Sequence, residues 1–203
     1  NYLKKLIKEN YLGKIISIRV EIFMHRNKKY FSNRKWIKNI KMVGGGITLH
    51  HAIHSIDQII YILNKRIHSV SFWKSNSNYK LPFEDTSGGW IRFSENIIAS
   101  INASVCCNSN LKNRIEIYGK KESICLEKDK IYHLPISKNG TVKILKKFKS
   151  DELGNYDNIW KSFGLALSKN IKILNKGEDI IKSEQVIKYM YESSNKQKVI
   201  YFK

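Results

Sequence analysis

The sequence has little cysteine, proline or acidic charge, and it has no long hydrophobic run. Its 203 residues include three cysteines, two prolines and 17 Asp and Glu residues. Three cysteines do not make a disulfide framework in a chain of this length, so we expect a reducing compartment, the cytoplasm. No stretch approaches the roughly 18 uninterrupted apolar residues of a membrane-spanning helix. The first residues also lack the apolar core of a secretory signal.

Arginine is scarce as well, although the chain is strongly basic. The 37 Lys and Arg residues give a formal net charge of +20, but only six of them are arginines. Arginine is the residue that grips phosphates and reads bases most specifically, so the charge favours solvated lysine-rich surfaces over a nucleic-acid partner. An anionic partner stays open as an alternative. The best-placed segment for it is His25–Met42, where basic residues alternate with Tyr30, Phe31 and Trp36.

What is present is the pattern of a folded chain with both helices and strands. Hydrophobic residues make up 42% of the sequence, and the length corresponds to about one domain, which we expect to span residues 1–203. Alternation of apolar and polar residues predicts a strand over Ile16–Ile22 and several more between residues 70 and 145. Amphipathic patterns predict helices over 47–63, 158–168 and 180–193. This order predicts an α+β fold, with helices on one face of a largely antiparallel sheet.

Half of the six histidines lie in the helix predicted over residues 47–63. At about 100° per residue, His50, His54, Asp57 and Tyr61 share one stripe beside the apolar face. Asp57 follows His54 by three residues, so its carboxylate is within reach of that imidazole and could orient it. An oriented imidazole on a rigid helix suits a general acid or base acting on a hydroxyl or carbonyl group.

Other interpretations of this region remain open. His50 and His54 have the spacing of zinc ligands, but His51 stands where H-E-x-x-H has its glutamate and no third ligand follows, so we expect no metal. The histidines could instead be structural or surface residues. Gly44–Gly46 could offer backbone N–H groups to an anion or allow a tight turn into the helix. Because no dinucleotide- or phosphate-binding glycine motif occurs, we expect no cofactor-binding residue in this chain.

The segment Gly44–Asp57, GGGITLHHAIHSID, resembles a known family signature. It is similar to G-G-G-x-x-x-x-x-x-I-H-x-x-D in the C-terminal domain of the glucose–fructose oxidoreductase / inositol dehydrogenase (Gfo/Idh/MocA) family. Further segments agree with that family in order and spacing, namely Gly13–Ile15, Glu84–Thr86, Ile115–Gly119, Gly177–Asp179 and Tyr191–Ser194.

The resemblance implies an open-faced sheet whose other face forms a subunit interface, and hence a homo-oligomer, a dimer or a tetramer. It also implies an N-terminal NAD(P)-binding Rossmann domain, absent from this chain, which carries a catalytic lysine. In the family the second histidine of the signature assists proton transfer at the oxidised sugar carbon, and His54 matches that position. His50 stands where the family usually has Asp, Asn or Gln in contact with a substrate hydroxyl.

We therefore expect the substrate-binding half of an oxidoreductase that uses NAD or NADP and acts on a sugar, polyol or nucleotide sugar. His54 is the expected catalytic residue and Asp57 its orienting partner, although the chain alone should be inactive. The expected substrate-binding residues are His50, His51, Arg34 and Trp36. The alternative is a non-catalytic, stand-alone binding or scaffold domain for an anionic partner.

Overall fold

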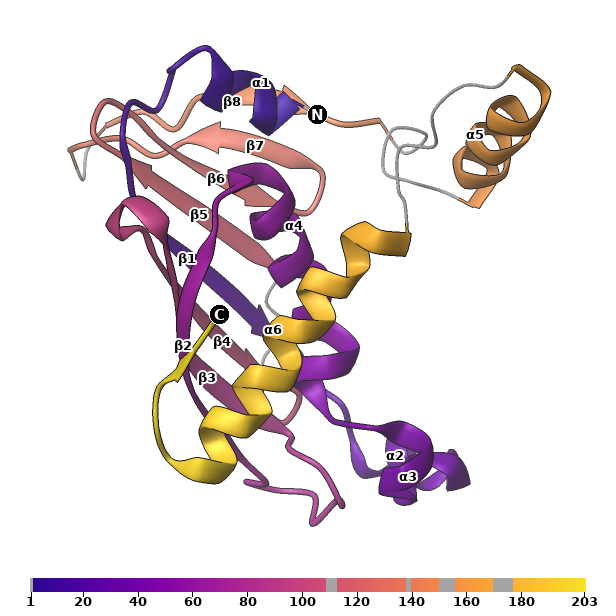
Figure 1. Ribbon diagram of the computed structural model, residues 1–203. Coiled ribbons are helices and arrows are strands. Elements are labelled where there is room, and N and C mark those ends of the chain that lie inside the picture. The colour runs from indigo at the N-terminus through magenta and orange to yellow at the C-terminus, as the bar shows by residue number, and fades with distance from the viewer. Residues whose placement is uncertain (1, 109–112, 138–139, 150–155, 170–176) are drawn as a thin grey trace.

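A nine-stranded sheet is the framework of the chain in the computed structural model (Figure 1). The structure describes residues 2–108, 113–137, 140–149, 156–169 and 177–203. The strands are β1 (Ile15–Phe23), β2 (Ile67–Ser75), β3 (Thr86–Phe93), β4 (Ile98–Ser104), β5 (Arg114–Gly119), β6 (Ser123–Glu127), β7 (Lys130–His133), β8 (Ile144–Lys147) and β9 (Ile200–Tyr201). Their order across the sheet is β8-β7-β6-β5-β1-β4-β3-β2-β9.

Every neighbouring pair of strands is antiparallel except β1 and β4, which run parallel with Ser17 opposite Ile98. A parallel pair needs a long connection, and the chain between these two strands contains the histidine helix and the β2–β3 hairpin. The predicted α+β fold with a largely antiparallel sheet is confirmed.

The helices are α1 (Tyr2–Lys8), α2 (Lys28–Ser32), η1 (Lys35–Lys38), α3 (Ile40–Val43), η2 (Thr48–Ala52), α4 (Ile53–Leu63), η3 (Ser94–Asn96), α5 (Tyr156–Lys169) and α6 (Gly177–Lys196). Figure 1 shows α4 and α6 lying across one face of the sheet. Their inward side chains close the core against the strands, because every second strand residue points to the same face. Fully buried members of this core include Ile18, Ile22, Ile56, Ile59, Ile101 and Met190.

The basic and aromatic segment His25–Met42 forms three short helices, which the sequence pattern did not predict. Asparagines start two of them: Asn27 Oδ1 accepts from the Tyr30 N–H at 3.0 Å, and Asn39 Oδ1 accepts from the Lys41 N–H at 3.0 Å. Such caps stabilise helices that are too short to be stable on their own. Phe31 is buried and anchors the segment to the core.

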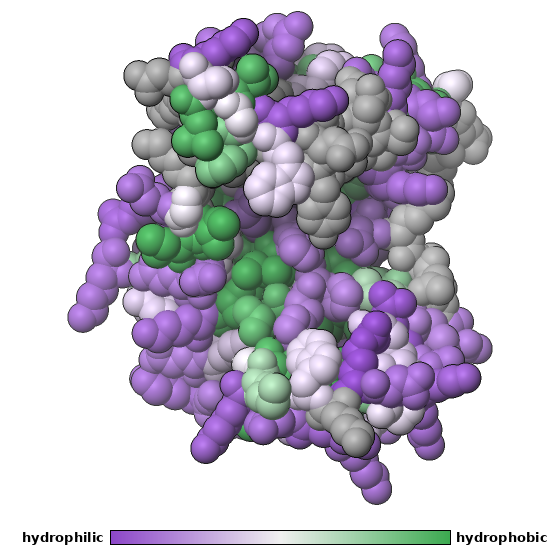
Figure 2. All heavy atoms as spheres, turned by 90° about the vertical axis from the view of Figure 1, so that its right-hand side faces the viewer, coloured by the Kyte–Doolittle hydropathy of each residue, from purple (hydrophilic) through white to green (hydrophobic). Residues whose placement is uncertain are grey.

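Lysine-rich surfaces surround this framework. Seen from the right of Figure 1, the molecule is largely hydrophilic, with a hydrophobic hollow near the middle of the face (Figure 2). Among the described residues, no helix has both the length and the apolar character needed to cross a bilayer.

Candidate functional site

The histidine helix begins with a π-helical turn, η2, before it continues as α4. In this turn the Ile53 N–H donates to the Thr48 carbonyl, one residue further back than in an α-helix. The wider turn rotates the side chains that precede it relative to those that follow. His50 and His54, which a regular helix would place on one stripe, therefore line two different cavities.

A buried carboxylate holds the start of this helix. Glu84 Oε1 accepts from the backbone N–H groups of Gly46 and Thr48, each at 3.2 Å, and from the Tyr191 hydroxyl at 2.8 Å. Burial and the neighbouring Glu84 carboxylate raise the pKa of Tyr191, so its hydroxyl keeps the proton that it donates. Glu84, in the segment Glu84–Thr86 that resembles the family, thus supports the start of this helix.

The glycines before the helix are needed for close packing. Gly44 has φ +75°, and a Cβ atom on Gly46 would lie 1.8 Å from the Glu84 carbonyl oxygen. Since Glu84 already occupies the N–H groups of Gly46 and Thr48, these donors are not available to a bound anion. The residues present here do not offer a cradle for the pyrophosphate of NAD or NADP.

The first cavity measures about 240 Å³ and lies between the basic segment and the helix start. His50 and His51 contribute from η2, Trp36 from η1, and Arg26 from the residues after β1. His50 Nε2 donates to the Val43 carbonyl oxygen at 3.1 Å. The Trp36 and His50 rings meet edge to face, with centroids 6.4 Å apart. The structure thus brings together three of the predicted substrate-binding residues, His50, His51 and Trp36.

Two arginines stack on one aromatic ring at the edge of this cavity. The guanidinium carbons of Arg26 and Arg34 lie 4.8 and 3.9 Å from the centroid of the Tyr30 ring. Within the described residues, Arg26 Nε is buried without a hydrogen-bond partner. Arg34 does not line the cavity and touches it only through Tyr30. The sequence grouped Arg26 with the other cations of the segment but did not single it out.

His51 is held neutral. Burial lowers its pKa, and the positive charges of Arg26 and then of His50 and His54 lower it further. A neutral imidazole next to Arg26 leaves the guanidinium as the main positive charge of the cavity and offers a ligand both a donor and an acceptor.

The second cavity, of about 230 Å³, contains His54. Ser55 and Gln58 line it from α4, and Asn113 and Lys128 line it from the ends of β5 and β6. The His54 side chain is exposed and forms no hydrogen bond or ion pair with the described residues. Asn113 and Lys128 carry no motif, and only the sheet topology brings them to His54, so sequence reasoning missed them.

Asp57 binds a residue of helix α6 and not His54, its predicted partner. Its Oδ1 accepts from the Ser183 hydroxyl of α6 at 2.6 Å, and Ser183 is 1% exposed. No hydrogen bond joins Asp57 to His54 in the structure. Across the described ranges, no group of three or more His, Cys, Asp and Glu residues is arranged to hold a metal ion.

Comparisons with solved structures give the same fold across almost the whole chain. The WlbA dehydrogenase from Bordetella pertussis, in complex with NADH and UDP-GlcNAcA, is 19% identical with a TM-score of 0.80, covering 99% of this chain and 60% of that one. A levoglucosan dehydrogenase in complex with NADH and levoglucosan is 18% identical with a TM-score of 0.80, covering 99% and 62%. The aldose-aldose oxidoreductase from Caulobacter crescentus, with glycerol, is 16% identical with a TM-score of 0.78, covering 98% and 59%.

This chain thus spans about three fifths of the length of those proteins. A search of curated protein sequences found no match. The sequence profile of the GFO/IDH/MocA C-terminal domain matches residues 1–125, more than half of the chain. The chain therefore belongs to the GFO/IDH/MocA C-terminal domain family, as the resemblance of Gly44–Asp57 predicted.

Proposed function

We propose that this chain is the substrate-binding part of an NAD- or NADP-dependent oxidoreductase that acts on a sugar, a polyol or a nucleotide sugar. Family membership supports the reaction class. Relatives of the same fold have been seen with NADH and either UDP-GlcNAcA or levoglucosan. The dinucleotide would supply the hydride chemistry and would be bound by a domain outside this chain, because no dinucleotide-binding glycine motif occurs here and Glu84 already takes the N–H groups before the histidine helix.

The observation that carries this proposal is the position of His54. Its imidazole is exposed at a cavity, sits on a helix whose start is fixed by Glu84, and has no hydrogen-bond or ion-pair partner among the described residues. Such an imidazole can accept the proton of the hydroxyl group on the carbon that loses hydride. In the reverse direction it returns this proton to the carbonyl oxygen. Lys128 and Asn113 offer donors to neighbouring substrate oxygens.

The rest of the substrate lies in the first cavity. An indole face at Trp36 suits a sugar or base ring, and the guanidinium of Arg26, which forms no ion pair with the described residues, suits an anionic group. His50 and His51 offer hydrogen bonds to ring hydroxyls. Arg34 supports the site through the Tyr30 ring, against which it stacks.

The test measures turnover of the complete enzyme with His54→Asn. We expect kcat to fall by about 100-fold or more while KM changes little, because the proton acceptor is lost and the binding groups remain. The control is His68→Asn, which alters an exposed histidine of β2. Near-normal turnover of the His54 variant would refute the assignment.

The 203-residue chain itself provides a second test. On addition of UDP-GlcNAcA or levoglucosan, the NMR signals of the His50 and His54 rings should shift, while those of His68 and His133 stay in place. Uniform small shifts of all four rings would show that neither ligand class occupies the two cavities.

A further inference from the structure

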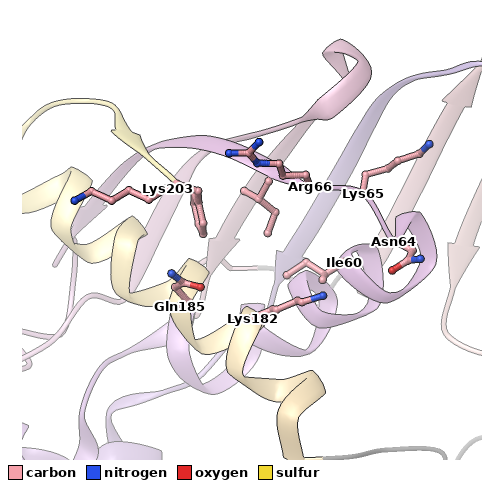
Figure 3. Close-up of a pocket in the computed structure, with 9 residues that line it drawn as sticks. Ile60, Asn64, Lys65, Arg66, Lys182, Gln185 and Lys203 are labelled. Atoms are coloured by element: carbon pink, nitrogen blue, oxygen red, sulfur yellow. The ribbon is translucent and has the colours of Figure 1, made fainter.

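A third cavity lies away from the histidines. It measures about 420 Å³ and opens between the α4–β2 connection, helix α6 and the last residues of the chain (Figure 3). Figure 3 shows Arg66 on one side of the pocket and Lys182 and Gln185 on the other, with Ile60 beside Lys182. None of the proposed chemistry uses this pocket.

Positive charge dominates the lining. Four cations, Lys65, Arg66, Lys182 and Lys203, contribute to it, and no carboxylate side chain does. Lys65 pairs with Glu95. Within the described part of the chain, the other three form no ion pair with an acidic side chain. Bringing like charges together is unfavourable unless an anion neutralises them, so Arg66 and Lys182, which have no acidic partner among the described residues, favour an anionic ligand.

The walls of the pocket are fixed by the core. The Arg66 carbonyl accepts from the Ser94 N–H at 2.8 Å, and the Phe202 N–H donates to the His68 carbonyl at 2.9 Å. The Phe202 ring also packs on Tyr189, with centroids 4.6 Å apart. The backbone and the Phe202 ring that border the pocket are therefore ordered before a ligand enters.

We propose that this pocket binds the diphosphate group of a small molecule. A diphosphate matches several cations better than a single carboxylate does, and Arg66 can hold it through two parallel hydrogen bonds. The amide of Gln185 supplies a neutral donor. Ile60, Ile67 and Phe202 form an apolar wall on which an attached ring can rest. The volume lies in the usual range of small-ligand sites.

The experiment measures binding to the 203-residue chain by calorimetry, with ADP, pyrophosphate and adenosine at low and moderate salt. We expect ADP and pyrophosphate to bind and adenosine to show no detectable binding. If the chain binds ADP more tightly than pyrophosphate, the diphosphate belongs to a nucleotide. If the two affinities are equal, the ligand is the free anion. Adenosine binding as tightly as ADP would overturn the proposal.

A net charge of +20 makes general attraction of anions the main rival explanation. The double variant Arg66→Gln, Lys182→Gln should weaken ADP binding by about tenfold or more. The matched control, Lys120→Gln with Lys121→Gln, removes the same charge from the exposed turn between β5 and β6 and should change the affinity by less than about twofold. Equal weakening in the two double variants would overturn the proposed site. Circular dichroism confirms that each variant keeps the fold.

Discussion

Gly46 has no room for a side chain, whereas Gly164 has ample room for one. A Cβ atom on Gly46 would overlap the Glu84 backbone, and nothing lies within 4 Å of the corresponding position on Gly164. Gly46→Ala should lower the free energy of unfolding by about 2–4 kcal/mol, because the Glu84 segment must move and its hydrogen bonds to the helix start are strained. Chemical denaturation measures this change.

Gly164→Ala is the matched control, because it adds the same methyl group to an exposed position of α5. It should raise helix stability by about 0.5–1 kcal/mol. If the two substitutions had equal effects, the close approach of Gly46 to Glu84 would not be a feature of the folded protein.

His51 makes stability depend on pH. Its folded-state pKa lies below the ordinary value of 6.5, so between the two pKa values the unfolded chain binds more protons than the native one. Stability is therefore expected to fall as the pH drops through about 6.5 towards the folded pKa. His51→Gln should flatten this part of the profile, as measured by denaturation at closely spaced pH values.

The control for this profile is His68→Gln, at an exposed site. A His51 variant that loses stability with falling pH as steeply as the wild type would show that other groups cause the dependence.

The sequence singled out candidate site residues, but it did not show their surroundings. His50, His54 and Trp36 stand out because their residue types are rare in this chain and sit near a recognisable signature. Lys128 is one of many lysines, and nothing local distinguishes it from a solvated surface residue. Its place beside His54 follows from strand pairing alone.

At the scale of elements, the histidine helix shows what a periodic pattern leaves out. Apolar spacing predicted one regular helix over 47–63, and the structure has a π turn followed by an α-helix. The difference arises from tertiary contacts: Glu84 binds the first N–H groups, and the buried Thr48 hydroxyl donates to Ser87 at 2.9 Å. A helical-wheel projection with a constant angle per residue includes neither of these tertiary contacts.

The link between α4 and α6 provides a prediction at this scale. The Ser183 hydroxyl donates to Asp57 at 2.6 Å, and hydrogen bonds to charged groups are stronger than neutral ones. Ser183→Ala and Asp57→Asn should each destabilise the chain, and a double-mutant cycle should give a coupling energy of about 1 kcal/mol or more. Additive effects of the two substitutions would mean that the pair does not contribute to stability.

At the scale of the whole molecule, strand positions were more predictable than strand order. Alternation predicted β1 to within one residue at each end, because one face of this strand is buried. The parallel pairing of β1 with β4 joins segments about 80 residues apart. Only the family resemblance, and not the local pattern, implied an open sheet of this kind.

The open face of the sheet carries the last prediction. Trp73, Trp90 and Ile98 are 59%, 51% and 42% exposed, and the strand register places them on the same face of β2, β3 and β4. Apolar groups gathered on one sheet face are typical of an interface. We propose that two copies of this chain associate through this face.

Sedimentation of the wild-type chain should therefore show a dimer or a larger assembly. Trp90→Glu should shift the chain towards the monomer, because a carboxylate would be buried without a partner in the centre of the interface. Ile136→Glu makes the same change of polarity at a side chain that is 99% exposed and outside the strands, and it should leave the assembly intact. The proposed association would be refuted if the wild-type chain sedimented as a monomer. It would also be refuted if the Trp90 variant stayed assembled.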